Sequence, residues 1–348
     1  MRSADLKTTF VWSCLSLLFA SAGCQPAATP VTPSSSANQP ATDKPKLVDV
    51  GLALNWYPEA EHGGFYAAAV HGYFAEEGLK VAIRPGGPGV RVVADVASGA
   101  VTFGVDNADK LLTWRAQQAD AVAVMSPLQD SPRCIMVHKK SGLTKLEDLA
   151  TKRPLTLAIN ADQPFALYLK KRVDLSDVQI VKYPGNVVQF LIEPDYGQQA
   201  YSFSEPFQAQ QKEGDPHCLM LSDLGFNTYT SMLIAQREMI DKQPELVAKM
   251  TRACVRGWRK YLAEPDATNK HIHEQNPEMG LDVLEFGVAA LKPLCLPAGF
   301  AAERLGEMTA ERWQTLAEQM VEIGSIKPGA VVAGEAFTTR FLTTDKSK

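Results

Sequence analysis

Strand-like and helix-like patterns alternate along most of this chain. After residue 46, short apolar runs rich in β-branched residues are separated by helical stretches, several of which end at a glycine. The clearest strands are expected at Lys46–Leu54, Ala121–Met125, Cys134–His138 and Gln199–Phe203. Because such alternation places strands side by side and covers them with helices, it predicts an α/β fold with mainly parallel sheets.

The pattern is long enough for two such sheets. One set of strand–helix units occupies residues 46–130 and a second occupies residues 131–230. The chain then returns with a strand at Ser231–Ala235 and a long amphipathic helix at Pro244–Tyr261. We therefore expect a hinged pair of lobes with a ligand cleft between them, in which residues 231–345 rejoin the first lobe.

The N-terminus is typical of an export signal. Arg2 and Lys7 accompany an apolar run, Thr8–Ala22, that is short for a membrane span, and Cys24 follows it closely. Small residues directly before a cysteine resemble a bacterial lipobox, which implies that residues 1–24 are a lipoprotein signal peptide and that Cys24 is lipidated. The alternative is ordinary secretion, with cleavage after the small residues Ala20–Ala22.

Residues 25–45 are rich in Pro, Ala, Ser and Thr and lack the apolar content to fold, so we predict a disordered linker. Acyl chains such as palmitate on Cys24 would anchor the protein to a bacterial membrane, in the periplasm or another extracytoplasmic space. The net charge of -4 and the interspersed charges exclude a basic stripe, so no nucleic-acid partner is expected.

The sequence has six cysteines, of which Cys14 lies in the signal segment and Cys24 is the lipidation candidate. The others are widely spaced: Cys134, Cys218, Cys254 and Cys295. No two of them have the spacing of zinc ligands, and we expect no metal and no cofactor. An oxidising compartment would permit a disulfide, but spacing does not assign one, and apolar surroundings favour buried free thiols.

Several motifs carry a family resemblance. They include Asn55-Trp56, the block Gly72–Val81 that reads GYFAEEGLKV, and Ser204–Pro206. These residues resemble the NMT-like family, the solute-binding proteins of ABC importers for sulfonates, nitrate and thiamine pyrimidine precursors. The resemblance covers residues 48–261. It implies a two-lobed periplasmic-binding-protein fold of type II, partnership with an ABC permease and ATPase subunits, and no enzymatic activity; we expect a monomer.

Within that family, Asn55-Trp56 followed by Pro58 and His62 is most similar to the branch that binds the formylaminopyrimidine precursor of thiamine. The implied ligand is that compound or a related flat heterocycle, with riboflavin, a sulfonate or nitrate as alternatives. Another class also stays open, because a pyrimidine-precursor synthase with the same fold consumes its own histidine and a pyridoxal cofactor, which would concern His62. A sensor or adhesion lipoprotein is a third hypothesis.

The candidate ligand residues follow predicted strands, where open α/β sheets bind ligands. Trp56 offers a ring face, and Glu59 can accept a hydrogen bond from an amine. The resemblance carries over Glu205 as a second partner for an amine, whereas Glu61 is expected to be solvated at a helix N-terminus. The full candidate set is Asn55, Trp56, Glu59, His62, Gly63, Tyr66, Gly87, Asn107, Gln129, Asn160, Tyr183, Tyr201 and Glu205. No catalytic residue is expected, because no Gly-x-Ser-x-Gly elbow occurs.

Overall fold

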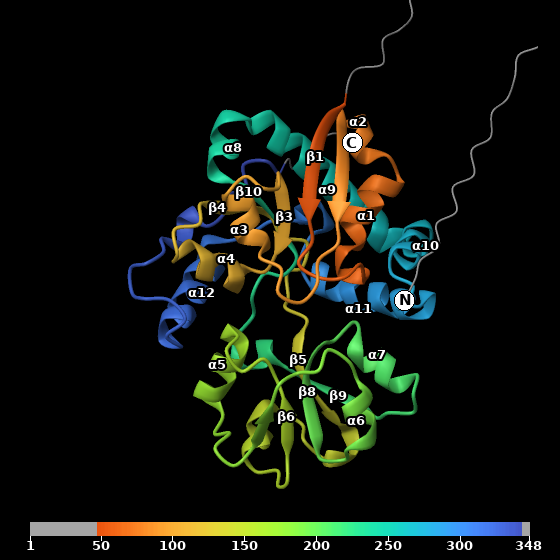
Figure 1. The fold of residues 1–348 in the computed structure, drawn as a ribbon, viewed down its shortest axis with the longest axis vertical. Helices are drawn as coiled ribbons and strands as arrows, with labels where there is room; N and C mark the ends of the chain where they lie inside the picture. The colour runs from red at the N-terminus through yellow and green to blue at the C-terminus, as the bar shows by residue number, and fades with distance from the viewer. Residues whose placement is uncertain (1–46, 343–348) are drawn as a thin grey trace, which may run out of the picture. The chain divides into compact units, whose positions relative to one another are not determined.

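A computed structural model describes residues 47–342, which contain two five-stranded sheets (Figure 1). The first sheet has the order β2-β1-β3-β10-β4 and the second β7-β6-β8-β5-β9. The strands are β1 Val48–Ala53, β2 Leu79–Arg84, β3 Phe103–Asp106, β4 Ala121–Met125, β5 Arg133–His138, β6 Thr156–Ala158, β7 Gln179–Val181, β8 Tyr196–Tyr201, β9 Pro216–Met220 and β10 Met232–Gln236. The predicted signal peptide, the linker and Cys24 lie outside the described residues.

Both sheets are built in the same way. In each, parallel pairing joins three neighbouring strands, and one antiparallel strand is inserted beyond them: β10 between β3 and β4, and β5 between β8 and β9. Each inserted strand is the one by which the chain arrives from the other sheet. The predicted α/β class is confirmed, whereas each sheet has as many antiparallel as parallel strand pairings.

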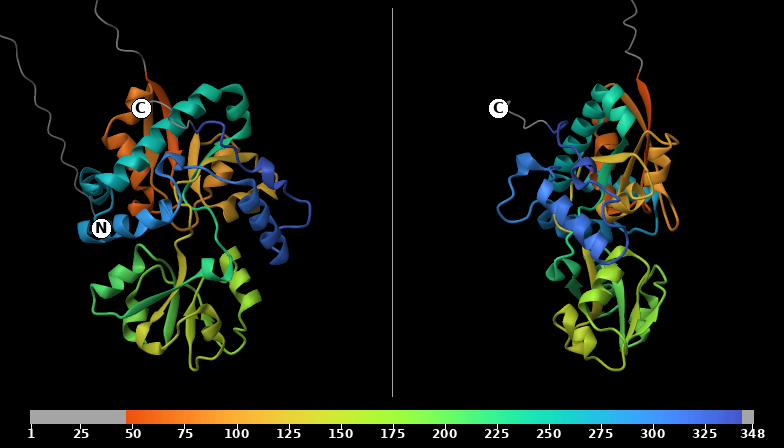
Figure 2. Two further views of the ribbon diagram at one scale, coloured as in Figure 1. Left: turned by 180° about the vertical axis from the view of Figure 1, so that it is seen from behind. Right: turned by 90° about the vertical axis from the view of Figure 1, so that its left-hand side faces the viewer.

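Helices cover both faces of the first sheet. Apolar residues of α1 and α9 pack on one face, and those of α3, α4 and α12 pack on the other; Figure 2 shows α9 crossing the face that is turned away in Figure 1. The helices are α1 Gly63–Val70, α2 Tyr73–Glu76, α3 Val92–Ala97, α4 Ala108–Arg115, α5 Pro164–Arg172, α6 Val188–Ile192, α7 Glu205–Gln210, α8 Arg237–Lys242, α9 Pro244–Ala263, α10 Asp266–Gln275, α11 Leu281–Cys295 and α12 Ala310–Glu322. Among residues 47–342, no helix combines the length and apolar content that a membrane crossing requires.

Glycines bring α1 and α9 into close contact. A Cβ atom at Gly63 would lie 1.9 Å from the Tyr261 ring, and one at Gly64 would lie 2.1 Å from the Trp258 ring. A Cβ atom at Gly257 would lie 2.1 Å from the Gly64 carbonyl oxygen. Helix packing therefore requires glycine at position 63. The predicted contact between Gly63 and the ligand stays a prediction.

Gly63→Ala is expected to destabilise the protein by about 3 kcal/mol, because overpacking at a fixed helix crossing forces the Tyr261 ring out of place. Gly334→Ala is the matched control, since a Cβ atom there would meet nothing within 4 Å. Urea unfolding of both variants measures the difference. Equal midpoints would contradict the packing argument.

Two chain segments connect the sheets and pair with each other. Leu128 forms an antiparallel bridge with Thr230. The Asn227 side chain donates to Asp130 Oδ1 at 2.8 Å and accepts from the Ser131 amide at 2.8 Å. This paired connection joins the two lobes, and the predicted hinge there and the lobe boundaries at 130/131 and 230/231 stay predictions.

Gln129, one of the candidate ligand residues, belongs to the first connecting segment. Its Nε2 donates to the Ser126 carbonyl at 3.1 Å and to the Glu307 carbonyl at 3.0 Å. Since the side chain is buried and its donors are engaged, Gln129 holds the first connecting segment against the first lobe.

Candidate ligand-binding site

Hydrogen bonds join the two sheets' strand ends directly. Asn107, just after β3, donates from Nδ2 to Tyr201 Oη at 3.0 Å, at the end of β8. Ser204 Oγ donates to Glu59 Oε2 at 3.4 Å, and Lys110 donates to Gln163. The carboxyl ends of the strands therefore face each other, which is where open α/β folds bind ligands.

The first lobe contributes a buried acidic turn, η1 (Ala60–His62). His62 Nε2 lies 2.9 Å from Asn55 Oδ1 and 3.1 Å from Glu61 Oε1. Within residues 47–342, neither Glu61 Oε2 nor His62 Nδ1 has a hydrogen-bond partner. These unsatisfied polar atoms are unusual in a folded interior and suit a site that receives a polar ligand.

The expectation that Glu61 is solvated is wrong. Its side chain is only 1% exposed. The cause is tertiary, because η1 packs under α11, where a Cβ atom at Gly287 would lie 2.7 Å from the Ala60 methyl group. That contact buries the whole turn, so Glu61 faces inward beside His62.

The second lobe arranges its polar groups around Glu205, the first residue of α7. Glu205 Oε2 accepts from the Tyr201 amide at 2.9 Å, and Oε1 accepts from the Tyr183 hydroxyl at 2.9 Å. Arg133 donates to Tyr201 Oη at 2.9 Å and stacks on the same ring at 4.1 Å. Glu205 thus positions both tyrosines of the candidate set.

Burial makes the carboxyl groups of this region hard to ionise. It raises the pKa of Glu59 well above its usual range, and the nearby Glu61 and Glu205 raise it further. Burial also raises the pKa of Glu205, and it raises that of Asp106 to about 7. A cationic or amine-bearing guest would favour ionisation of these carboxyl groups, whereas an anion would raise their pKa values further.

The space between the facing strand ends is small. A cavity of about 10 Å³ is lined by Asn107, Asp109, Ser131, Arg133, Phe165, Tyr201, Phe226, Thr228 and Thr230. That volume holds about one water molecule. A ring-sized ligand would fit between these strand ends only if the lobes separated.

Trp56 and Gly87 lie at the rim of the first lobe. The half-buried Trp56 ring meets the exposed Tyr57 ring edge-on, with centroids 5.3 Å apart. Gly87 has a φ of 157°, and a Cβ atom there would lie 3.2 Å from Tyr57. In the described part of the chain, no side-chain hydrogen bond ties these residues to the Asn107–Tyr201 contact.

Tyr66 and Asn160 lie apart from these contacts. The Tyr66 ring stands against His271 with centroids 5.6 Å apart, on the side of α1 that faces α10. The Asn160 amide donates to Gln199 Oε1 at 2.7 Å, which secures the loop after β6. Ligand contact by either residue stays a prediction.

Sequence reasoning did not propose Arg133 or Asp106 as ligand residues, and it gave Asp106 only a helix-capping role. Arg133 is the charged residue directly before the apolar run Cys134–His138, and that position at the mouth of a buried strand was a usable indication. Asp106 ends β3 and is only 9% exposed. Its carboxylate accepts from the Asn107 amide at 2.9 Å.

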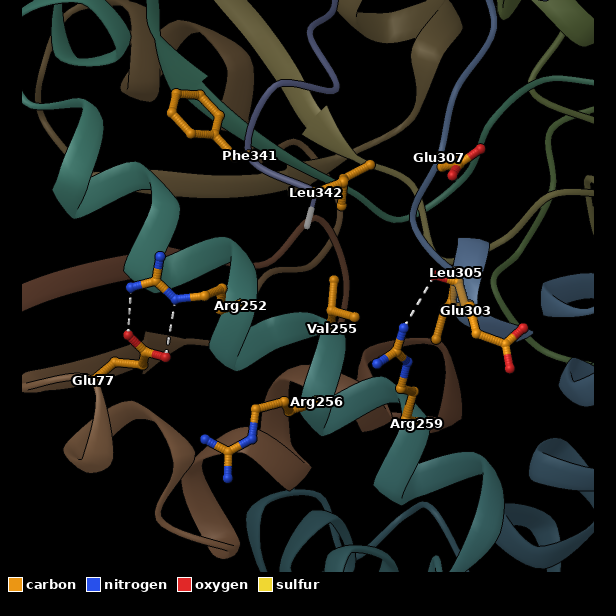
Figure 3. Close-up of a pocket in the computed structure, with 10 residues that line it drawn as sticks. All are labelled: Glu77, Arg252, Val255, Arg256, Arg259, Glu303, Leu305, Glu307, Phe341 and Leu342. Carbon is orange, nitrogen blue, oxygen red and sulfur yellow. Dashed lines mark hydrogen bonds and ion pairs between the residues drawn. The ribbon is translucent and has the colours of Figure 1, made fainter. Parts of the chain in front are cut away.

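A larger cavity of about 190 Å³ lies elsewhere, along α9 (Figure 3). Its arginines are engaged within the first lobe: Arg252 pairs with Glu77 at 2.8 Å, and Arg259 donates to the Glu303 carbonyl at 3.1 Å. None of the candidate ligand residues lines it. Among residues 47–342, no group of three His, Cys, Asp or Glu side chains could hold a metal ion.

The two sheets and their facing strand ends define a two-lobed α/β fold of type II. The sulfonate-binding protein SsuA of Xanthomonas axonopodis pv. citri, solved bound to MOPS, matches with a TM-score of 0.62 over 84% of this chain and 99% of its own, at 15% identity. This likeness confirms the predicted fold.

The chain belongs to the family described as NMT1/THI5 like, whose sequence model matches residues 59–268. A protein named riboflavin-binding protein RibY, from Chloroflexus aurantiacus, is 25% identical over 91% of this chain and 93% of its own length. A formylaminopyrimidine-binding protein from Halalkalibacterium halodurans is 24% identical over 67% of this chain and 72% of its own length. A 4-amino-5-hydroxymethyl-2-methylpyrimidine phosphate synthase from Aspergillus parasiticus is 27% identical over 67% of this chain and 72% of its own length.

Proposed function

We propose that the protein is the extracytoplasmic solute receptor of an ABC importer and that it captures a flat, amine-bearing heterocycle of the formylaminopyrimidine type. The observation that carries this proposal is the buried group of carboxyls, Glu59, Glu61 and Asp106, at strand ends that face the second lobe. The relatives named as binding proteins support the same role.

In this proposal the ligand enters when the hinge opens. Its amine donates hydrogen bonds to the carboxyl groups, which ionise and release their protons to solvent, while Trp56 covers the ring. The two lobes then close around the ligand. The closed form docks on a permease whose ATPase subunits supply the energy, and lipidation at Cys24 keeps the receptor at the membrane.

Riboflavin is the second candidate ligand, because the relative with that name aligns along 91% of this chain. A flavin is also flat and carries hydrogen-bond donors. Sulfonate and nitrate fit less well, since they bring no hydrogen-bond donor for the carboxyl oxygens.

An enzymatic role is the alternative of another class. It is favoured by the synthase-named relatives and by the buried His62, whose Nδ1 lacks a partner among residues 47–342. A pyridoxal cofactor bound to a lysine would give an absorbance band that borohydride abolishes. A purified protein with that band would refute a purely binding role.

A thermal-shift screen tests the ligand class. We expect an aminopyrimidine at saturating concentration to raise the unfolding temperature by about 5 °C, because a ligand at 100 times its Kd stabilises the folded state by about 2.7 kcal/mol. Trp56→Ala and Glu205→Ala should each abolish the shift. A shift with taurine or nitrate alone would overturn the choice of ligand. Unchanged affinity in both variants would show that Trp56 and Glu205 do not form the ligand site.

A further inference from the structure

Two cysteines of the second sheet lie side by side. Cys134 is on β5 and Cys218 is on the neighbouring antiparallel strand β9, where Cys134 is opposite Met220 and Met136 is opposite Cys218. The two cysteines are thus a diagonal pair whose side chains project from the same face of the sheet. Their Sγ atoms are 3.2 Å apart.

This distance is short enough for a covalent link. A disulfide has an S–S length of about 2.05 Å, so the two sulfur atoms need to approach by about 1.2 Å. Diagonal pairs are spaced more widely than directly opposed ones. Bond formation therefore requires rotation of the side chains and an approach of the two strands.

The other two cysteines of the described chain have a different setting. Cys254 and Cys295 are fully buried in the core of the first lobe, and within residues 47–342 neither sulfur makes a hydrogen bond. They provide an internal comparison for any reaction at Cys134 and Cys218.

We propose that Cys134 and Cys218 form a disulfide bond in the exported protein. The bond would join the strand that enters the second sheet to the last strand before the chain leaves it. The bond would close a loop between two cysteines that are 84 positions apart in the sequence. Its presence in the cell rests on the proposed export to an oxidising compartment, whereas its formation in the purified protein does not.

The oxidant is a small-molecule or protein disulfide, which reacts with the two cysteines by thiol–disulfide exchange. Cys218 is half-buried and Cys134 is buried, and burial raises the pKa of the Cys134 thiol, so Cys218 reacts first. The Cys218 thiolate attacks the oxidant's disulfide, releases one thiolate and forms a mixed disulfide. The Cys134 thiolate then attacks Cys218 Sγ and releases the second. Two electrons pass to the oxidant, and the two protein protons go to the released thiolates.

The link has a consequence for the cleft. Arg133, which holds the Tyr201 hydroxyl and ring, directly precedes Cys134 on β5. β9 leads through the turn η4 (Leu221–Leu224) to the second connecting segment. A bond between β5 and β9 therefore fixes both connecting segments where they meet the second lobe.

The test treats the purified full chain with oxidised glutathione, alkylates the remaining thiols and maps peptides without reduction. We expect one linked peptide pair containing Cys134 and Cys218, with Cys254 and Cys295 alkylated. Cys134→Ser and Cys218→Ser should each eliminate the pair, and the matched control Cys254→Ser should retain it.

A second measurement compares unfolding temperatures before and after dithiothreitol. Reduction should lower the unfolding temperature by about 5 °C in the unsubstituted protein and leave the double serine variant unchanged. Alkylation of both cysteines after oxidation, a stable glutathione adduct on Cys218, or a link to any other cysteine would each overturn the proposal. These readouts need no transported ligand, so they are independent of the proposed function.

Discussion

Glu59→Gln is expected to weaken binding of an aminopyrimidine by about 100-fold, because a buried charge-assisted hydrogen bond to the ligand amine contributes on the order of 2–5 kcal/mol. Without ligand, the same variant should be more stable than the unsubstituted protein above neutral pH. Burial and the neighbouring Glu61 and Glu205 raise the pKa of Glu59, so ionising it in the closed cleft is unfavourable. Glutamine has nearly the same side-chain size as glutamate but carries no ionisable group.

Calorimetry measures the affinity, and urea unfolding measures the stability. The matched control is Glu147→Gln, an exposed carboxyl in the second lobe, which should change neither. Loss of affinity together with loss of stability would show that Glu59 serves the fold, and unchanged affinity would remove it from the site.

Asp106→Asn is expected to change how the stability of the ligand-free protein depends on pH. In the folded state burial raises the Asp106 pKa from 3.8 to about 7. As pH rises through this window, the unfolded chain ionises while the folded carboxyl stays protonated. The folded state therefore binds more protons, and stability falls until about pH 7 and is then constant. The variant should lack this fall and be more stable at about pH 8 by about 4 kcal/mol, at roughly 1.4 kcal/mol per pKa unit.

Urea midpoints at a series of pH values give the two curves. Asn can keep the acceptor for the Asn107 amide, so the backbone contact is preserved. Parallel curves for the two proteins would mean that another group causes the fall. Affinity for an amine-bearing ligand should show the opposite trend and increase with pH, because binding requires the ionised carboxyl groups.

Much of the architecture was predictable because local patterns report burial. The strands predicted at Ala121–Met125 and Cys134–His138 are β4 and β5 to within one residue, and the helix predicted from Pro244 is α9. β8 was placed three residues too late, since it begins at Tyr196 instead of Gln199. Its Gln198 is fully buried although glutamine is polar, so the apolar pattern did not mark the start of the strand.

The sequence by itself determined the order of strands and helices and the place of candidate residues at strand ends, because the period of apolar side chains reflects which face of an element is buried. Only the tertiary structure decided that Ser204 meets Glu59 across 145 positions and that Glu61 turns inward. Desolvation, pKa and the 3.2 Å approach of Cys134 to Cys218 depend on which elements pack together. That information lies in contacts between distant segments, which no local periodicity contains.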